Sequence, residues 1–148
     1  MMNDMLAVDV LLVEDNLQDA ELTIRSFKKH KLASNVIVVE DGAEALDFIF
    51  CRGKYGERDI KHPPRVIFLD LKLPLVGGLE VLRAIKQDTR TRSIPVVVVT
   101  SSREDPDIKA AYELGANSYV VKPVDFESFT DSIGKLGLYW LLINQPPK

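Results

Sequence analysis

The chain has 148 residues, which is the size of a single domain and enough to bury a substantial core. Its net charge of -3 and its dispersed lysines and arginines give no reason to expect a nucleic-acid partner. Cys51 is the only cysteine, so no intrachain disulfide can form, which fits a reducing cytosol. No apolar run approaches the ~20 residues that span a bilayer, and no signal peptide is recognisable at the N-terminus. We therefore expect a cytoplasmic protein without a nucleic-acid or membrane partner.

Apolar runs typical of buried strands alternate with helical patterns along the chain, which predicts consecutive βα units and a parallel sheet. The expected strands cover residues 8–13, 35–39, 66–69, 96–99 and 119–121. The expected helices cover residues 17–29, 43–50, 79–86, 105–114 and 125–142. Residues 51–64, rich in Gly, Pro and charge, are expected to form a long exposed loop. These elements predict an α/β fold with five strands in one domain, residues 1–148.

Polar side chains follow four of the five expected strands, at the point where each strand ends. Glu14 and Asp15 follow the first strand, Asp70 the third, Thr100 the fourth and Lys122 the fifth. Because parallel strands place their carboxyl ends on one edge of the sheet, where open α/β folds bind ligands, these residues are expected to form one site.

The chemistry of this residue set favours phosphoryl transfer. Three carboxylates brought together repel one another, and a hard divalent cation such as Mg²⁺ relieves that repulsion. An Asp carboxylate can attack phosphorus to form an aspartyl phosphate while the metal neutralises phosphoryl oxygens. The Thr100 hydroxyl and the Lys122 ammonium are suited to bind the remaining phosphoryl oxygens.

Five short motifs occur in one order along the chain: LVEDN at 12–16, FLDLKLP at 68–74, GG at 77–78, PVVVVTS at 95–101 and YVVKP at 119–123. With these motifs the chain resembles the response-regulator receiver domain over nearly its whole length. The separations between Asp70, Thr100, Tyr119 and Lys122 agree with the same family. The resemblance implies a flavodoxin-like receiver fold, a doubly wound parallel sheet of five strands in the order 2-1-3-4-5.

The resemblance also implies a role for each site residue. Asp70 is the expected phosphoacceptor, accepting a phosphoryl group from a partner histidine kinase. Mg²⁺ is the expected cofactor, held by Glu14, Asp15 and Asp70 and by the backbone carbonyl of Lys72. Such a domain assists its own phosphorylation and dephosphorylation, yet its role is signalling rather than that of an enzyme.

The remaining motif residues have implied roles in switching. Thr100 corresponds to the hydroxyl that moves toward the phosphoryl group, and Tyr119 to the aromatic side chain that changes rotamer with it. Lys122 corresponds to the lysine that pairs with the phosphoryl group, and the family commonly has a cis bond before Pro123. Tyr119 taken alone can also be an ordinary half-buried strand residue without a switching role.

Residues 50–56 and 138–142 are similar to small receivers that serve phytochrome-type histidine kinases and form homodimers without an output domain. Apolar residues in the last expected helix recur at helical spacing, with further apolar side chains on its other faces. Gly134 and Gly137 in that helix are expected to let a partner helix approach closely. The predicted homodimer interface consists of Phe129, Ile133, Leu136, Tyr139 and Trp140.

Three alternatives have other functions. A flavodoxin-type redox protein shares the fold, but no Ser/Thr/Gly-rich loop follows the first strand. A hydrolase with an aspartyl nucleophile would require a second Asp two residues after Asp70, where Lys72 stands. A dimerisation module with a receiver fold and no dependence on phosphorylation is the third alternative, which only a phosphorylation experiment excludes.

Overall fold

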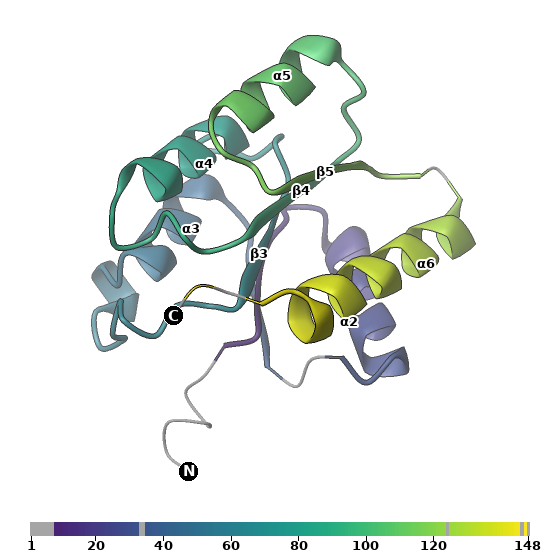
Figure 1. The fold of residues 1–148 in the computed structure, drawn as a ribbon, viewed down its shortest axis with the longest axis horizontal. Helices are drawn as coiled ribbons and strands as arrows, with labels where there is room; N and C mark the ends of the chain where they lie inside the picture. Colours follow the sequence, from purple (N-terminus) through teal and green to yellow (C-terminus); the bar gives the residue numbers. More distant parts are fainter. Residues whose placement is uncertain (1–7, 33–34, 124, 146, 148) are drawn as a thin grey trace.

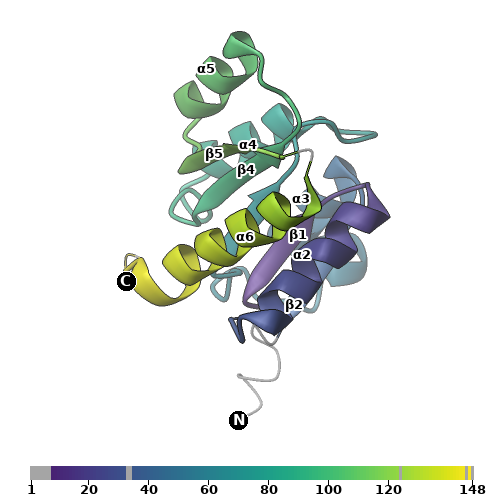
Figure 2. The same cartoon turned by 90° about the vertical axis from the view of Figure 1, so that its right-hand side faces the viewer.

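In the computed structural model, which describes residues 8–32, 35–123, 125–145 and 147, all strands form one parallel sheet of order β2-β1-β3-β4-β5. Helices cover both faces of the sheet, with α2 and α6 side by side on one face and α3, α4 and α5 on the other (Figures 1 and 2). This arrangement confirms the predicted fold class and strand order. The strands are β1 (Val10–Val13), β2 (Val36–Val39), β3 (Val66–Leu69), β4 (Val96–Thr100) and β5 (Ser118–Val121).

The helices lie close to their predicted positions because local capping signals define their starts. The side chain of Asn16 accepts a hydrogen bond from the Asp19 N–H, and that of Asp125 accepts one from the Ser128 N–H. Within the part of the chain that the structure describes, no helix has the length and apolarity needed to cross a membrane. The helices are α2 (Leu17–Lys29), α3 (Gly42–Ile49), α4 (Gly78–Gln87), α5 (Asp105–Glu113) and α6 (Phe126–Gly137).

Each face of the sheet has its own apolar core. Leu11 and Ile67, in the two central strands, point toward α3 and α4, whereas Val10 and Phe68 point toward α2 and α6. Phe27 of α2 meets Phe68 edge to face, with their ring centroids 5.5 Å apart. Burial on both faces explains why these strands appear in the sequence as continuous apolar runs.

The long loop after α3 is fastened to that helix. It contains a short 3₁₀ helix, η1 (Gly53–Tyr55), whose Tyr55 ring meets the Phe48 ring edge to face at 4.9 Å. The Arg58 guanidinium lies 3.7 Å from the centroid of the Phe48 ring and donates a hydrogen bond to the Phe48 carbonyl. The predicted loop is therefore present, with part of it packed on α3.

The inner face of α6 packs on α2 of the same chain. Phe129 and Ile133 are buried in the core beneath α6, so the prediction that these two residues form a dimer interface is wrong. A Cβ on Gly134 would lie 2.7 Å from the His30 ring, and one on Gly137 would lie 2.8 Å from Phe27. The helix that approaches these two glycines closely is therefore α2 of the same chain. The apolar side of α6 covers the sheet and is not available to a partner.

The chain continues from α6 into one π-helical segment, η2 (Leu138–Ile143), which confirms a helical C-terminal region. Leu141 is buried and its carbonyl accepts a hydrogen bond from Arg65, which fixes this end of the helix to the start of β3. Four large apolar side chains of η2 point outward, while Leu136 and Trp140 are half-buried against the core. We call the outward set the C-terminal apolar surface: Leu138, Tyr139, Leu142 and Ile143.

The two adjacent glycines at the start of α4 give a first prediction. A Cβ on Gly78 would lie 2.3 Å from the Asp70 carbonyl oxygen and 2.5 Å from the Leu71 Cα, whereas a Cβ on Gly77 meets nothing within 4 Å. We expect Gly78→Ala to lower the free energy of unfolding by about 1–3 kcal/mol, because backbone must move to make room. Gly77→Ala is the matched control and should change it by less than about 1 kcal/mol. Urea denaturation measures both, and equal losses would contradict the close approach of α4 to Asp70.

Candidate functional site: acidic cluster and buried lysine

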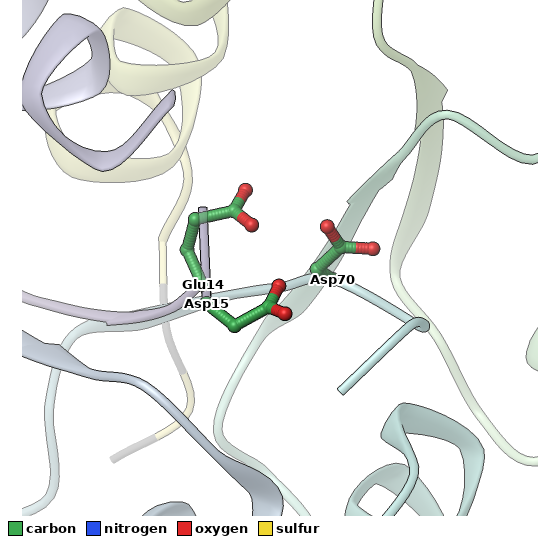
Figure 3. A group of neighbouring side chains, drawn as sticks. All are labelled: Glu14, Asp15 and Asp70. Atoms are coloured by element: carbon green, nitrogen blue, oxygen red, sulfur yellow. The ribbon is translucent and has the colours of Figure 1, made fainter. Parts of the chain in front are cut away.

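Two neighbouring strands bring the acidic residues together. β1 and β3 are paired in register, with Val13 opposite Leu69, so the residues that follow them lie side by side. The Asp70 N–H donates to the Val13 carbonyl at 3.1 Å, which continues the ladder beyond the strand end. Figure 3 shows the resulting group of carboxylates, Glu14, Asp15 and Asp70, at the carboxyl edge of the sheet.

The acidic group suits a divalent cation. One carboxylate oxygen from each of Glu14, Asp15 and Asp70 lies within 4.8 Å of the others. Glu14 and Asp70 are buried, whereas Asp15 is exposed and leaves an open side toward solvent. Hard cations such as Mg²⁺ take carboxylate oxygens and retain water, so this donor set and its one open side fit such an ion. The backbone carbonyl of Lys72 stays a predicted ligand, while its N–H donates to Asp70 Oδ1 at 3.1 Å.

A single ammonium group binds three carboxylates at this edge. Lys122 Nζ, on a side chain that is only 10% exposed, lies 2.5 Å from Glu14 Oε1, 2.9 Å from Asp70 Oδ2 and 2.9 Å from Asp19 Oδ2. An ammonium has three N–H donors, and here each one has an acidic acceptor. Lys122 therefore links the end of β5 to the ends of β1 and β3 and to the first turn of α2.

Burial and the shared lysine shift the pKa values of the two inner carboxyl groups in opposite directions. Burial raises the pKa of Glu14 to about 7, although the hydrogen bond and charge of Lys122 act against that shift. Burial also acts to raise the pKa of Asp70, but Lys122, the Lys72 N–H and the Thr100 hydroxyl together hold it below its usual value. Asp70 is thus kept ionised, which is the form of a carboxylate that acts as a nucleophile or ligand.

Thr100 and Tyr119 lie on the α5 side of Asp70. Thr100 is fully buried at the end of β4, and its carbonyl accepts a hydrogen bond from the Lys122 N–H at 2.7 Å. The half-buried Tyr119 donates its hydroxyl to the Ser102 carbonyl, at 3.0 Å. Ser102 in turn donates its own hydroxyl to Asp107 of α5 at 2.5 Å. The structure therefore connects Thr100, next to Asp70, through the following loop to Tyr119 and α5.

Asp19 was not among the predicted site residues, and one expectation about the backbone was wrong. Asp19 lies one helical turn after Asp15, a spacing that places it at the start of α2 and could have drawn attention to it. The bond between Lys122 and Pro123 is trans, whereas the family resemblance implied a cis bond. The other predicted site residues, from Glu14 to Lys122, all lie at the carboxyl edge of the sheet.

With this geometry in place, comparison with known proteins gives the family. The sequence model of the response regulator receiver domain matches residues 10–134. The chain belongs to the response regulator receiver family of two-component systems, which sets aside the flavodoxin and hydrolase alternatives. Receiver domains act with histidine kinases and bind Mg²⁺ or Mn²⁺ at an acidic site.

Two curated relatives match most of the chain. The probable methanogenesis regulatory protein FilR2 of Methanothrix harundinacea is 40% identical over 138 residues, which are 93% of this chain and 86% of FilR2. The response regulator Rcp1 of Synechocystis sp. is 35% identical over 132 residues, 89% of this chain and 88% of Rcp1. Each matches nearly the whole of the relative, so the similarity is not confined to the site motifs.

Solved structures give the same family. The Mn²⁺-bound form of Rcp1 matches with a TM-score of 0.88 at 33% identity, and the match covers 95% of this chain and 99% of the Rcp1 chain. The phosphorylated cyanobacterial phytochrome response regulator RcpA has a TM-score of 0.89 at 32% identity, and the match covers 96% of this chain and 99% of the RcpA chain. The bacteriophytochrome response regulator RtBRR is 50% identical with a TM-score of 0.75, and the match covers 95% of this chain and 84% of the RtBRR chain.

Cation binding at the acidic cluster is expected to depend on pH. A metal must displace the proton from Glu14, whose pKa of about 7 means that this carboxyl is mostly protonated in mildly acidic solution. We therefore expect the affinity for Mg²⁺ to fall by about tenfold for each pH unit below pH 7 and to level off above it. Calorimetric titration with Mg²⁺ across this range measures the effect. Glu14→Gln should bind more weakly with little pH dependence, and an equal pH dependence in that variant would contradict the assignment to Glu14.

Proposed function

We propose that this protein is a phosphoacceptor response regulator that takes a phosphoryl group onto Asp70 from a phosphohistidine of a partner kinase. The observation that supports this most strongly is the environment of Asp70, an ionised carboxylate that is bound by the Lys122 ammonium and lies beside two further carboxylates. Glu14, Asp15 and Asp70 would hold Mg²⁺, with the Lys72 carbonyl as a further ligand. Bound Mg²⁺ would supply the positive charge that neutralises phosphoryl oxygens during the transfer.

The chain's own residues account for the rest of the reaction. An oxygen of Asp70 forms a bond to phosphorus as the phosphorus–nitrogen bond of phosphohistidine breaks, and the electron pair stays on the imidazole nitrogen. The low pKa of Asp70 keeps its electron pairs available for the attack. The Lys122 ammonium and the Thr100 hydroxyl donate hydrogen bonds to phosphoryl oxygens, so that they offset the added charge.

The phosphoryl group would then change the surface on the α5 side. Thr100 moves toward the new oxygens, and Tyr119 gives up its hydrogen bond to Ser102 and turns inward with it. Thr100 and Tyr119 together would have two arrangements, and the charge of the phosphoryl group would shift the equilibrium between them. The same site assists the loss of the phosphoryl group to water, so the protein acts as a timed signal and not as a metabolic enzyme.

The partner that fits best is a phytochrome-type histidine kinase in the cytoplasm. RcpA and RtBRR are named as phytochrome response regulators, and both match at least 95% of this chain. Residues 50–56 and 138–142, which are similar to small receivers of this kind, support the same partner. We also propose that residues 1–148 form one receiver domain.

Intact mass after incubation with acetyl phosphate and Mg²⁺ tests the phosphoacceptor function. We expect a gain of one phosphoryl group, about 80 Da, that is lost in Asp70→Asn and after Mg²⁺ is removed with EDTA. Asp131→Asn is a matched control, because Asp131 is exposed on α6 and should leave the gain unchanged. Absence of the gain both with acetyl phosphate and with a phosphorylated kinase would leave the dimerisation module as the better explanation.

We also propose that two copies of the chain associate through the C-terminal apolar surface, with Leu136 and Trp140 at its edge. All four side chains of this surface are 44–59% exposed, and they adjoin one another on η2. Contiguous exposed apolar area of this kind marks interaction surfaces, and two-fold homodimers are the commonest soluble assemblies. Tyr139 packs edge to face on Trp140 at 5.0 Å, so it can act as a rigid aromatic anchor.

Light scattering over a range of concentrations tests the dimer. Leu142→Asp places a charge in the C-terminal apolar surface and should weaken self-association by about tenfold or more. Tyr112→Asp is the control, because Tyr112 is equally exposed, at 51%, but lies on α5. A wild-type chain that stays monomeric at all concentrations, or equal effects of both variants, would overturn this interface. Repeating the measurement with Asp70→Asn shows whether assembly requires phosphorylation.

A further inference from the structure

Among the residues that the structure describes, Asp19 is the one acidic partner of Lys122 that lies outside the group of three expected metal ligands. Its Oδ2 accepts from the Lys122 ammonium at 2.9 Å, as closely as Asp70 does. The metal-binding group that the structure brings together is Glu14, Asp15 and Asp70. The Asp19 side chain is 28% exposed, compared with 5% for Glu14 and 8% for Asp70, so it lies at the solvent side of the lysine.

Two hydrogen bonds hold the backbone of Asp19, so the position from which its side chain extends is fixed. Its N–H donates to the side chain of Asn16 at 3.0 Å, and its carbonyl accepts from the Thr23 hydroxyl at 2.8 Å. Asn16 is the N-cap of α2, and its own N–H donates to Glu14 Oε2 at 3.2 Å. The first turn of α2 is therefore tied to the end of β1, and Asp19 projects from that turn to Lys122.

The three acceptors of Lys122 differ in what happens to them when the site is used. In the proposed function, Glu14 and Asp70 turn to the cation, and Asp70 becomes esterified to phosphorus. Asp19 takes part in neither event, so it is the acceptor that can keep one N–H of the ammonium while the others meet phosphoryl oxygens. A lysine side chain is long and has many rotamers, and without this anchor it loses its defined position once the other two acceptors leave.

We propose that Asp19 is a positioning residue, which holds the Lys122 ammonium in the place where it meets the phosphoryl group that is transferred to Asp70. The inference rests on the proposed function of Asp70. It concerns the step in which an oxygen of Asp70 bonds to phosphorus and, with acetyl phosphate as donor, acetate leaves with the electron pair of the broken phosphorus–oxygen bond. Asp19 acts in this step through Lys122 and touches no reacting atom.

Two variants with the same charge separate positioning from a general charge effect. Asp19→Asn keeps an oxygen acceptor for Lys122, whereas Asp19→Ala removes it, and both remove one negative charge. We expect Asp19→Ala to be phosphorylated by acetyl phosphate about tenfold more slowly than Asp19→Asn, at equal Mg²⁺ affinity in the two variants. Glu21→Ala is the control on the same helix, because the exposed Glu21 side chain pairs with Arg25, at 2.8 Å, and not with Lys122. Equal rates in the Asn and Ala variants would overturn positioning.

A second readout does not depend on phosphorylation. In a ¹H–¹⁵N spectrum of lysine side chains, an ammonium whose donors are all engaged exchanges slowly with water and gives a resolved signal. We expect the Lys122 signal, assigned by its loss in Lys122→Met, to persist in Asp19→Asn and to broaden in Asp19→Ala. An unchanged signal in Asp19→Ala would overturn the proposal.

Lys86 supplies an internal reference for that spectrum. Its ammonium donates to the Arg92 and Ile94 carbonyls and to Asn117 Oδ1, at 3.0, 2.7 and 3.0 Å, away from the site. Burial lowers the pKa of Lys86 to about 8, so the spectrum is recorded below that pH, and its signal should be the same in every variant. If the wild type takes up no phosphoryl group, the proposed function fails, while the spectrum still decides whether Asp19 holds Lys122.

Discussion

The interaction on which the site depends is the buried contact between one ammonium and the carboxylates that surround it. Parallel pairing of β1 and β3 forces Glu14 and Asp70 together, and without a counter-charge their repulsion would oppose the close packing of the two strand ends. Lys122 supplies that counter-charge from β5. Removing one partner of such a buried pair typically costs about 3–5 kcal/mol, so Lys122 supports the fold as well as the chemistry.

The same contact explains how a small chemical event can reach a distant surface. A cation or a phosphoryl group at this edge changes which groups the ammonium binds, and the groups it leaves must find new partners. Thr100 is joined to the backbone of Lys122, and the loop after Thr100 holds Tyr119 through Ser102. The chain of contacts therefore runs from the acidic cluster along the end of β4 to α5. On the other face, α2 and α6 form a tightly packed pair that is suited to stay fixed.

Local sequence patterns determined the elements and the position of the site. Apolar runs predict buried strands because both faces of the sheet are covered, and Asn16 and Asp125 predict helix starts because their side chains satisfy free N–H groups. Polar residues at strand ends predict a site because parallel strands all end on one edge. Each of these signals depends on a few neighbouring residues or on the direction of the strands, and so each can be read without tertiary structure.

The contacts between side chains that are distant in sequence depend on tertiary packing. The sequence does not show that Asp19 binds Lys122, 103 residues away, because that contact depends on how α2 packs against the sheet. It does not show that Phe129 and Ile133 face the sheet, or that Gly134 and Gly137 admit α2, since an apolar stripe fits a core and a dimer interface equally well. Local sequence patterns therefore determine the class of fold and the residues that are available to the site. The packing of helices on the sheet determines which of these residues contact one another.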